Sequence, residues 1–410
     1  MTVKPASSAS GLLTRAEPRT LGFDGGRLGR IREALEREVA EQRIPGAVVG
    51  VVRRGQLALL EGIGYRDKAA NASLWADAIF SIASMTKPMT SVAIMILHEE
   101  GRLLLTDPAS KFLPQLAGMT VAASPTSDVL ETVPAAREMT VQDLLRHTSG
   151  LTYRDRGTSA AHKLYPGSSI NAAVAFEKDA FLRELAKAPL VYQPGTAWEY
   201  GFSTDILGLI VEAVSGKSLG AFLKERLWDP LGMADTGFVI PASSAGRYAR
   251  ALPNDPLTGQ PQSVHHATGD VMKWESGGGG AVSTAADYLR FTQMLLNGGA
   301  LGDTRILGRK TVELMRSDHL GPEVVNRITT MDPSCNGYGF GLGFAVRRQP
   351  GVAGILGSAG DYYWSGVYGT YFWIDPAEQL TTVFMSAAPG MIRLRYRQLL
   401  RALVLQALTD

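Results

Sequence analysis

The stretch Phe80-Ser-Ile-Ala-Ser-Met-Thr-Lys-Pro88 places a serine, a lysine and a proline at the expected start of a helix. Proline is best tolerated in the first helical turn, where its missing N–H costs nothing, and a long helical run follows from residue 89 to residue 100. Residues three apart share a helix face, so the Ser84 hydroxyl and the Lys87 amine are expected to be neighbours. A hydroxyl beside an amine that is kept from water is the pattern of an activated nucleophile.

A second serine lies in a hydrolase-like pattern. Gly216-Lys-Ser-Leu-Gly220 matches the Gly-x-Ser-x-Gly elbow of lipase-type enzymes, but that elbow needs a strand before the serine. Here a helix is predicted over residues 204–214. Gly216 is therefore interpreted as the C-cap of that helix and Ser218 as the N-cap of the next one, which leaves Ser84 as the candidate nucleophile.

Composition and charge argue against several classes of function. The 410 residues carry 41 Lys and Arg against 39 Asp and Glu, so a nucleic-acid or anionic membrane partner is not expected. The single cysteine, Cys335, is interpreted as a buried thiol, and the histidines have no metal-ligand spacing, so no metal and no cofactor are expected. The first residues lack a long apolar segment, which predicts a cytoplasmic protein without a membrane span. Nothing indicates the oligomeric state.

Predicted strands come from the two ends of the chain and predicted helices mainly from its middle. The strands are expected over residues 47–52, 57–60, 339–346, 366–374 and 380–385. The helices are expected over residues 27–43, 84–100, 140–147, 176–188, 204–214, 218–227, 288–296 and 391–408. This pattern predicts an α+β fold, in which an antiparallel sheet flanked by helices carries an inserted, mostly helical domain.

Domain boundaries follow from the same pattern. An N-terminal arm is expected over residues 1–22, an α/β domain over residues 23–84 and 285–410, and the helical domain over residues 85–284. The active site is expected at the seam between the two domains, because the Ser84 stretch lies there.

Two local patterns predict backbone features. Thr140 and Asp143 have the spacing of a capping box, and His147 is interpreted as a structural residue that caps its own turn. The run Ser276-Gly-Gly-Gly-Gly280 has neither a strand before it nor Lys-Ser/Thr after it, as a phosphate-binding loop would require. We interpret this run as close backbone packing.

Seven segments resemble, in order, the serine β-lactamase-like and penicillin-binding-protein-like superfamily. The resemblance is strongest to the family VIII carboxylesterases, which are related in fold to class C β-lactamases. The segments are Phe80–Pro88, Gly101–Pro108, Leu144–Leu151, Pro194–Tyr200, Pro230–Met233, Gly278–Thr284 and Trp364–Gly369. The resemblance implies a β-lactamase/transpeptidase-like fold, and Ser-x-x-Lys is the acyl-enzyme motif of these enzymes.

The resemblance also implies roles for individual residues. Ser84 matches the nucleophile, Lys87 its lysine partner, and Tyr200 the tyrosine that opens the second motif. The backbone N–H groups of Ser84 and Val367 would form the oxyanion hole. The substrate-binding residues would be Trp364, Gly366, Phe202 and Tyr153.

Two motifs depart from those of class C β-lactamases. Tyr-x-Asn is replaced by Tyr200-Gly-Phe202, and Lys-Thr-Gly by Trp364-Ser-Gly366. Both changes are typical of the esterase branch and favour a neutral ester over a charged drug. We therefore predict a carboxylesterase that cleaves small-molecule, short-chain acyl esters. The alternatives are an acyltransferase on the same fold and a β-lactamase- or DD-peptidase-like amide hydrolase with weak activity on β-lactams.

Overall fold

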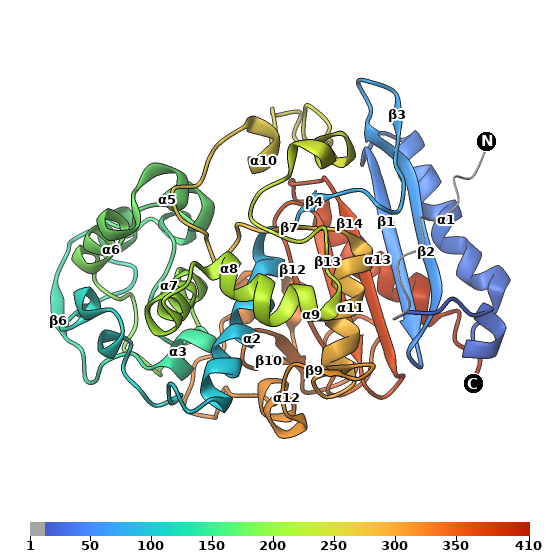
Figure 1. The fold of residues 1–410 in the computed structure, drawn as a ribbon. Coiled ribbons are helices and arrows are strands. Elements are labelled where there is room, and N and C mark those ends of the chain that lie inside the picture. The colour runs from blue at the N-terminus through green and yellow to red at the C-terminus, as the bar shows by residue number, and fades with distance from the viewer. Residues whose placement is uncertain (1–12) are drawn as a thin grey trace.

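The computed structural model describes residues 13–410 and is built around one eight-stranded antiparallel sheet (Figure 1). The strand order is β10-β11-β12-β13-β14-β1-β2-β3. The bounds are β1 (Gly46–Arg53), β2 (Gln56–Asp67), β3 (Ala72–Ser73), β10 (Tyr338–Phe340), β11 (Ala345–Arg347), β12 (Tyr362–Ser365), β13 (Thr370–Asp375) and β14 (Leu380–Ser386). The predicted antiparallel sheet, formed by strands from both ends of the chain, is confirmed.

Helices cover both faces of this sheet (Figure 1). Helices α1 (Gly25–Ala40) and α13 (Arg393–Leu405) pack together on one face, and α11 (Ala285–Leu296) packs on β1 and β14 on the other. Every residue of β1 and β14 is buried, as expected for strands covered on both faces. At Gly50 in β1, a Cβ atom would lie 2.5 Å from the Leu289 side chain of α11, so a larger residue there would have to displace this leucine.

The middle of the chain supplies most of the remaining helices, which lie beside the sheet (Figure 1). They are α2 (Thr86–Glu99), α3 (Val141–Leu145), α4 (Ala160–Lys163), α5 (Ser169–Ala175), α6 (Lys178–Lys187), α7 (Ser203–Ser215), α8 (Leu219–Leu223), α9 (Asp229–Leu231) and α10 (His265–Thr268). A short helix, α12 (Arg309–Met315), follows α11. Thr140 and Asp143 form the predicted capping box of α3. The Ser218 hydroxyl accepts from the Ala221 N–H at the start of α8, as predicted.

Three short two-stranded sheets complete the secondary structure. They are formed by β4 (Phe80–Ser81) with β7 (Val282–Ser283), β5 (Thr120–Ala122) with β6 (Thr132–Pro134), and β8 (Ala300–Leu301) with β9 (Thr304–Arg305). The β4–β7 pair joins the Ser84 stretch to the end of the glycine run. Within residues 13–410 no single helix is long and apolar enough to cross a membrane; only the bent pair Ser203–Ser215 and Leu219–Leu231, at 77°, passes on length and composition.

The structure differs from the predicted strands near the C-terminal end of the sheet. Residues 339–346, predicted as one strand, form the hairpin of β10 and β11, because Gly343 turns the chain with a φ of 105°. Strand β13 starts at Thr370 rather than Gly366, since a turn that ends at Gly369 precedes it. Strand β12 was not predicted, because its residues show no simple alternation of apolar and polar side chains.

The N-terminal arm is partly attached to the fold. Its residues 1–12 lie outside the described part of the chain. The backbone of Arg15 pairs with that of Leu57 of β2 as an isolated parallel β-bridge. Residues 18–21 form a 3-10 helix, in which Leu21 is buried. Residues 15–22 are thus held against the fold by backbone pairing with β2 and by the buried Leu21 rather than lying loose.

Candidate active site

Ser84 and Lys87 lie together at the start of α2. Ser84 is half-buried in a 3-10 turn, Ala83–Met85, that leads directly into the helix. Ala83 has a φ of 44°, which is uncommon for a residue with a side chain and is found mainly where the surrounding structure enforces it. The Lys87 Nζ atom lies 3.5 Å from Ser84 Oγ. The helical spacing therefore brings the two groups together as predicted.

Lys87 is 2% exposed, and its amine is surrounded by acceptors. Its Nζ atom donates to the Gly278 carbonyl at 2.6 Å and to the Tyr153 hydroxyl at 3.3 Å. It also lies 4.6 Å from the centre of the Tyr200 ring, within range of a cation–π interaction. The amine is thus held in place by groups from three distant segments, and its remaining N–H faces Ser84.

Tyr200 lies in the loop before α7, with its ring packed and its hydroxyl free. The Tyr200 hydroxyl is buried and has no hydrogen-bond partner within residues 13–410. The ring contacts Trp364, with ring centres 5.5 Å apart. Gly201 makes this placement possible, because a Cβ atom there would lie 2.4 Å from the Thr152 backbone. An unpartnered buried hydroxyl is costly, which is typical of a group kept for a ligand or for catalysis.

His147 supports Tyr200 from behind. Its ring lies 4.9 Å from the Tyr200 ring and also contacts Trp198 and Phe340, while its backbone has a φ of 58°. Burial and the charge of Lys87 hold the pKa of His147 well below its usual value, so the imidazole is neutral. The predicted capping role is not what the side chain does, because it packs against aromatic rings.

The two predicted oxyanion donors come from segments in direct contact. Thr370 donates its hydroxyl to the Ile82 carbonyl at 3.1 Å, and a Cβ atom on Gly366 would lie 2.3 Å from that carbonyl. Only glycine therefore lets the turn after β12 approach the Ser84 stretch. Within residues 13–410 the N–H of Val367, next in that turn, makes no hydrogen bond, while the Ser84 N–H lies in a first helical turn, whose N–H groups lack acceptors inside the helix.

The predicted substrate-binding residues divide into two groups. Tyr153 and Trp364 lie against Tyr200, with ring centres 5.7 and 5.5 Å away. Phe202 is instead 0% exposed, and its ring packs behind Tyr153 and against Phe181. Phe202 thus belongs to the core behind the site, and the sequence resemblance could not show this because it carries no side-chain direction.

Three residues that sequence reasoning did not select complete the site. The Tyr153 hydroxyl lies 2.5 Å from Ser169 Oγ, and Ser169 donates to Asp205 at 2.6 Å. The other Asp205 oxygen accepts from the Gly278 N–H at 3.1 Å. The available signal was the aspartate in the first turn of helix α7, directly before the apolar run Ile206–Val211, since buried aspartates are rare without partners.

Comparison with known proteins places this arrangement in a family. The Beta-lactamase family matches residues 31–406. This chain belongs to the beta-lactamase family. Among its relatives, Protein Rv1367c of Mycobacterium tuberculosis (strain ATCC 25618 / H37Rv) is 36% identical over 360 residues, covering 86% of this chain and 88% of that protein. Esterase EstB of Burkholderia gladioli is 30% identical over 390 residues, covering 90% and 93%.

Solved structures agree with this membership of the beta-lactamase family. The structure of EstCE1, described as a hydrolase with promiscuous acyltransferase activity, has a TM-score of 0.75 and 26% identity to this chain. The match covers 92% of this chain and 98% of EstCE1. The predicted β-lactamase/transpeptidase fold and the predicted relation to family VIII esterases are therefore confirmed.

In this beta-lactamase family member, the two departures from the class C motifs have different consequences. The position of the class C asparagine is occupied by Phe202, which faces the core. The position of the class C lysine is occupied by Trp364, whose ring is in contact with Tyr200. Trp364 therefore makes the edge of the site beside Tyr200 neutral and aromatic, while Phe202 adds only to the core behind the site.

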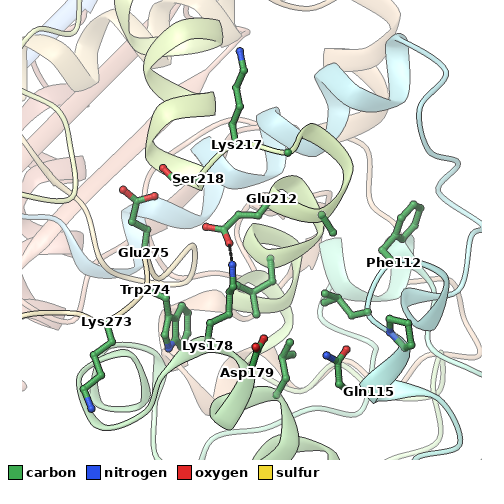
Figure 2. Close-up of a pocket in the computed structure, with 16 residues that line it drawn as sticks. Phe112, Gln115, Lys178, Asp179, Glu212, Lys217, Ser218, Lys273, Trp274 and Glu275 are labelled. Carbon is green, nitrogen blue, oxygen red and sulfur yellow. Dashed lines mark hydrogen bonds and ion pairs between the residues drawn. The ribbon is translucent and has the colours of Figure 1, made fainter.

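The cysteine and the second candidate serine of this family member play no part in the site around Ser84. Burial raises the pKa of the Cys335 thiol to about 12, so it stays protonated, as its interpretation as a buried thiol implies. Within residues 13–410 no group of three His, Cys, Asp or Glu side chains could hold a metal ion. A pocket of about 670 Å³ at the far end of α7 is lined by Ser218 and by the ion pair of Lys178 with Glu212, and contains none of the predicted site residues (Figure 2).

Proposed function

We propose that this protein is a serine carboxylesterase that cleaves small-molecule, short-chain acyl esters through an acyl-enzyme on Ser84. The observation that carries the proposal is that the Lys87 amine lies 3.5 Å from Ser84 Oγ and 4.6 Å from the centre of the Tyr200 ring, whose buried hydroxyl has no partner within residues 13–410. The similarity to Esterase EstB supports the same reaction class. The neutral aromatic edge at Trp364 supports a neutral ester rather than a charged drug.

The reaction proceeds in two steps. Ser84 Oγ attacks the ester carbonyl carbon, while its proton passes to the general base that Lys87 and Tyr200 form together. The oxyanion is held by the N–H groups of Ser84 and Val367, and each such donor contributes roughly 10²–10³ in rate. The bond to the alcohol then breaks, and Tyr200 returns the proton to the leaving oxygen. Water attacks the acyl-enzyme in the second step and releases the acid.

Acyl transfer is the second candidate function, and the similarity to EstCE1 favours it. The same three residues would form the acyl-enzyme, and an alcohol would then replace water as the acceptor. Product analysis with p-nitrophenyl butyrate and added methanol separates the two functions. An acyltransferase gives mainly methyl butyrate at methanol concentrations where an esterase still gives mainly butyrate.

The proposed nucleophile is tested against the other candidate serine. Ser84→Ala is expected to lower kcat/KM for p-nitrophenyl butyrate by about a thousandfold or more, because no other group can form the acyl-enzyme. Ser218→Ala is the matched control, because it also replaces a serine near the start of a helix. It should keep activity within about twofold and lose about 1 kcal/mol of stability as a helix cap. If Ser218→Ala silences the enzyme and Ser84→Ala does not, the assignment is wrong.

A further inference from the structure

A closed ring of hydrogen bonds lies behind the proposed nucleophile. Starting at Lys87, it passes through the hydroxyls of Tyr153 and Ser169 to one Asp205 oxygen, with distances of 3.3, 2.5 and 2.6 Å. The other Asp205 oxygen accepts from the Gly278 N–H at 3.1 Å, and the Gly278 carbonyl accepts from Lys87 at 2.6 Å. The ring joins five segments that are far apart in the sequence.

These bonds fit a donor at the Lys87 end and an acceptor at the Asp205 end. A carboxylate only accepts and an ammonium only donates, while each hydroxyl between them accepts one hydrogen and donates one. The path therefore runs one way, from Lys87 through Tyr153 and Ser169 to Asp205. Burial raises the pKa of Tyr153 well above its usual value, so its hydroxyl keeps the proton that this path requires.

Asp205 is fully buried, and its carboxyl group is surrounded by hydrogen-bond donors. Burial raises the pKa of the Asp205 carboxyl, and the charge of Lys87 and the bonded donors offset part of that rise. Three donors point at the carboxylate: the hydroxyls of Ser169 and Ser276, each at 2.6 Å, and the Gly278 N–H. Such donors favour the ionised acid. No ion pair joins Asp205 directly to a cation within residues 13–410, so Lys87 is the charge that it balances through the ring.

We infer that Asp205 is a positioning residue that holds Lys87 as an ammonium ion throughout the reaction, so that Tyr200 serves as the general base. This inference rests on the proposed function and adds a division of labour between Lys87 and Tyr200. The three N–H bonds of the ammonium then have three acceptors, namely the Gly278 carbonyl, the Tyr153 hydroxyl and Ser84 Oγ. The ammonium stabilises negative charge that develops on Ser84 Oγ as the proton leaves.

Other titratable groups around Lys87 do not supply this counter-charge. Tyr200 and Tyr153 approach it from two loops, and both are phenols. His147 approaches from a third segment, and its pKa is held well below the usual value, so it is neutral at the pH of the reaction. Asp205, on α7, is therefore the acid whose charge the ring connects to the amine.

The test measures how fast an alkyl fluorophosphonate labels Ser84 in the full-length protein between pH 5 and pH 10. Ser84 Oγ forms a bond to phosphorus, fluoride leaves, and the hydroxyl proton passes to the general base, so the reading needs no knowledge of the natural ester. The variants are Asp205→Asn, Ser169→Ala and Ser276→Ala. Ser276→Ala is the matched control, because it removes a bond to the same carboxylate outside the path to Lys87.

The expected result is a shift of the pH profile. Asp205→Asn should slow labelling by about tenfold or more and move the alkaline limb of the profile about one pH unit lower, because the buried ammonium would lose its counter-charge. Ser169→Ala should move the limb in the same direction by less, and Ser276→Ala should leave it near its wild-type position. A purely structural role would lower the labelling rate together with the thermal midpoint and leave the limb where it is.

Three outcomes decide the matter. If the alkaline limb stays in place in both Asp205→Asn and Ser169→Ala, the inference is wrong. If Asp205→Asn does not fold, the comparison of Ser169→Ala with Ser276→Ala decides, and equal profiles overturn the inference. If wild-type Ser84 is not labelled at any pH, the proposed function itself fails, and the inference fails with it.

Discussion

At this site, the absence of a side chain matters as much as the functional groups that other residues carry. Gly278 donates its N–H to Asp205 and accepts from Lys87 with its carbonyl, so its backbone is part of the ring. A Cβ atom at this position would lie 2.3 Å from an Asp205 oxygen and 2.4 Å from Ser169 Oγ. The predicted close packing of the glycine run is thus confirmed, and at Gly278 it serves the site directly.

Gly278→Ala is expected to disturb both stability and activity. The added methyl group must displace Asp205 or Ser169, which should cost about 1–3 kcal/mol as overpacking and lower esterase kcat/KM by about tenfold or more. Gly279→Ala is the matched control, because its Cβ atom would be no closer than 3.5 Å to Ile170. Urea unfolding and ester hydrolysis measure the two effects. Equal behaviour of the two variants would contradict the role given to Gly278.

Elements near the site depend on how their ends are satisfied. Helix α3 is short, and its start is held by Asp143, which is buried and accepts from the Thr140 N–H at 3.0 Å and from Arg146 at 3.0 Å. Hydrogen bonds and charges from Arg137 and Arg146 lower the pKa of Asp143 despite its burial. The helix leads into His147, so this cap also positions the ring behind Tyr200.

Asp143→Asn is expected to destabilise the protein in a pH-dependent way. A lowered pKa in the folded state means that the carboxylate stabilises the fold above its usual pKa of 3.8 and that this contribution is lost as the pH falls through the lower folded value. The variant should therefore lose about 2 kcal/mol at pH 7 and less at pH 3, which lies below the usual pKa. Urea unfolding at both pH values measures this, with the neighbouring exposed Glu138→Gln as control. An equal loss at pH 3 would refute it.

At the scale of the whole molecule, the last helix is fastened to the sheet by buried charge. Asp361 bonds Arg347 of β11 and Arg401 of α13, each at 2.8 Å, and all three side chains are 0% exposed. Arg401 also donates to the Tyr371 hydroxyl of β13 at 2.7 Å. One carboxylate thus connects the C-terminal helix to strands on the Trp364 side of the sheet.

Asp361→Asn should destabilise the molecule by about 3–5 kcal/mol, because two guanidinium groups would stay buried without their counter-charge. The free energy of unfolding in urea is the measurement. Glu184→Gln removes one partner of the exposed pair with Lys187 and is expected to change stability by less than about 1 kcal/mol. A variant at position 361 with wild-type stability would show that the network does not hold the helix.

Local rules explain which parts of the fold and site could be predicted. The neighbouring positions of Ser84 and Lys87, the capping box at Thr140 and the helix cap at Ser218 depend on residues three or four apart, and so can be read from the sequence. The hairpin of β1 and β2 follows from its two apolar runs and short turn.

What only the tertiary structure decided is the set of contacts between distant segments. The tertiary structure directs the Phe202 side chain into the core and brings Tyr153 within hydrogen-bond distance of Lys87. It also closes the hydrogen-bond ring through Asp205 and Gly278. These contacts depend on which way each side chain points once helices and sheet have packed, and no spacing within one segment encodes that direction. The stretch around Ser84 thus determined the candidate chemistry, while packing between remote segments decided which charges and hydroxyls surround it.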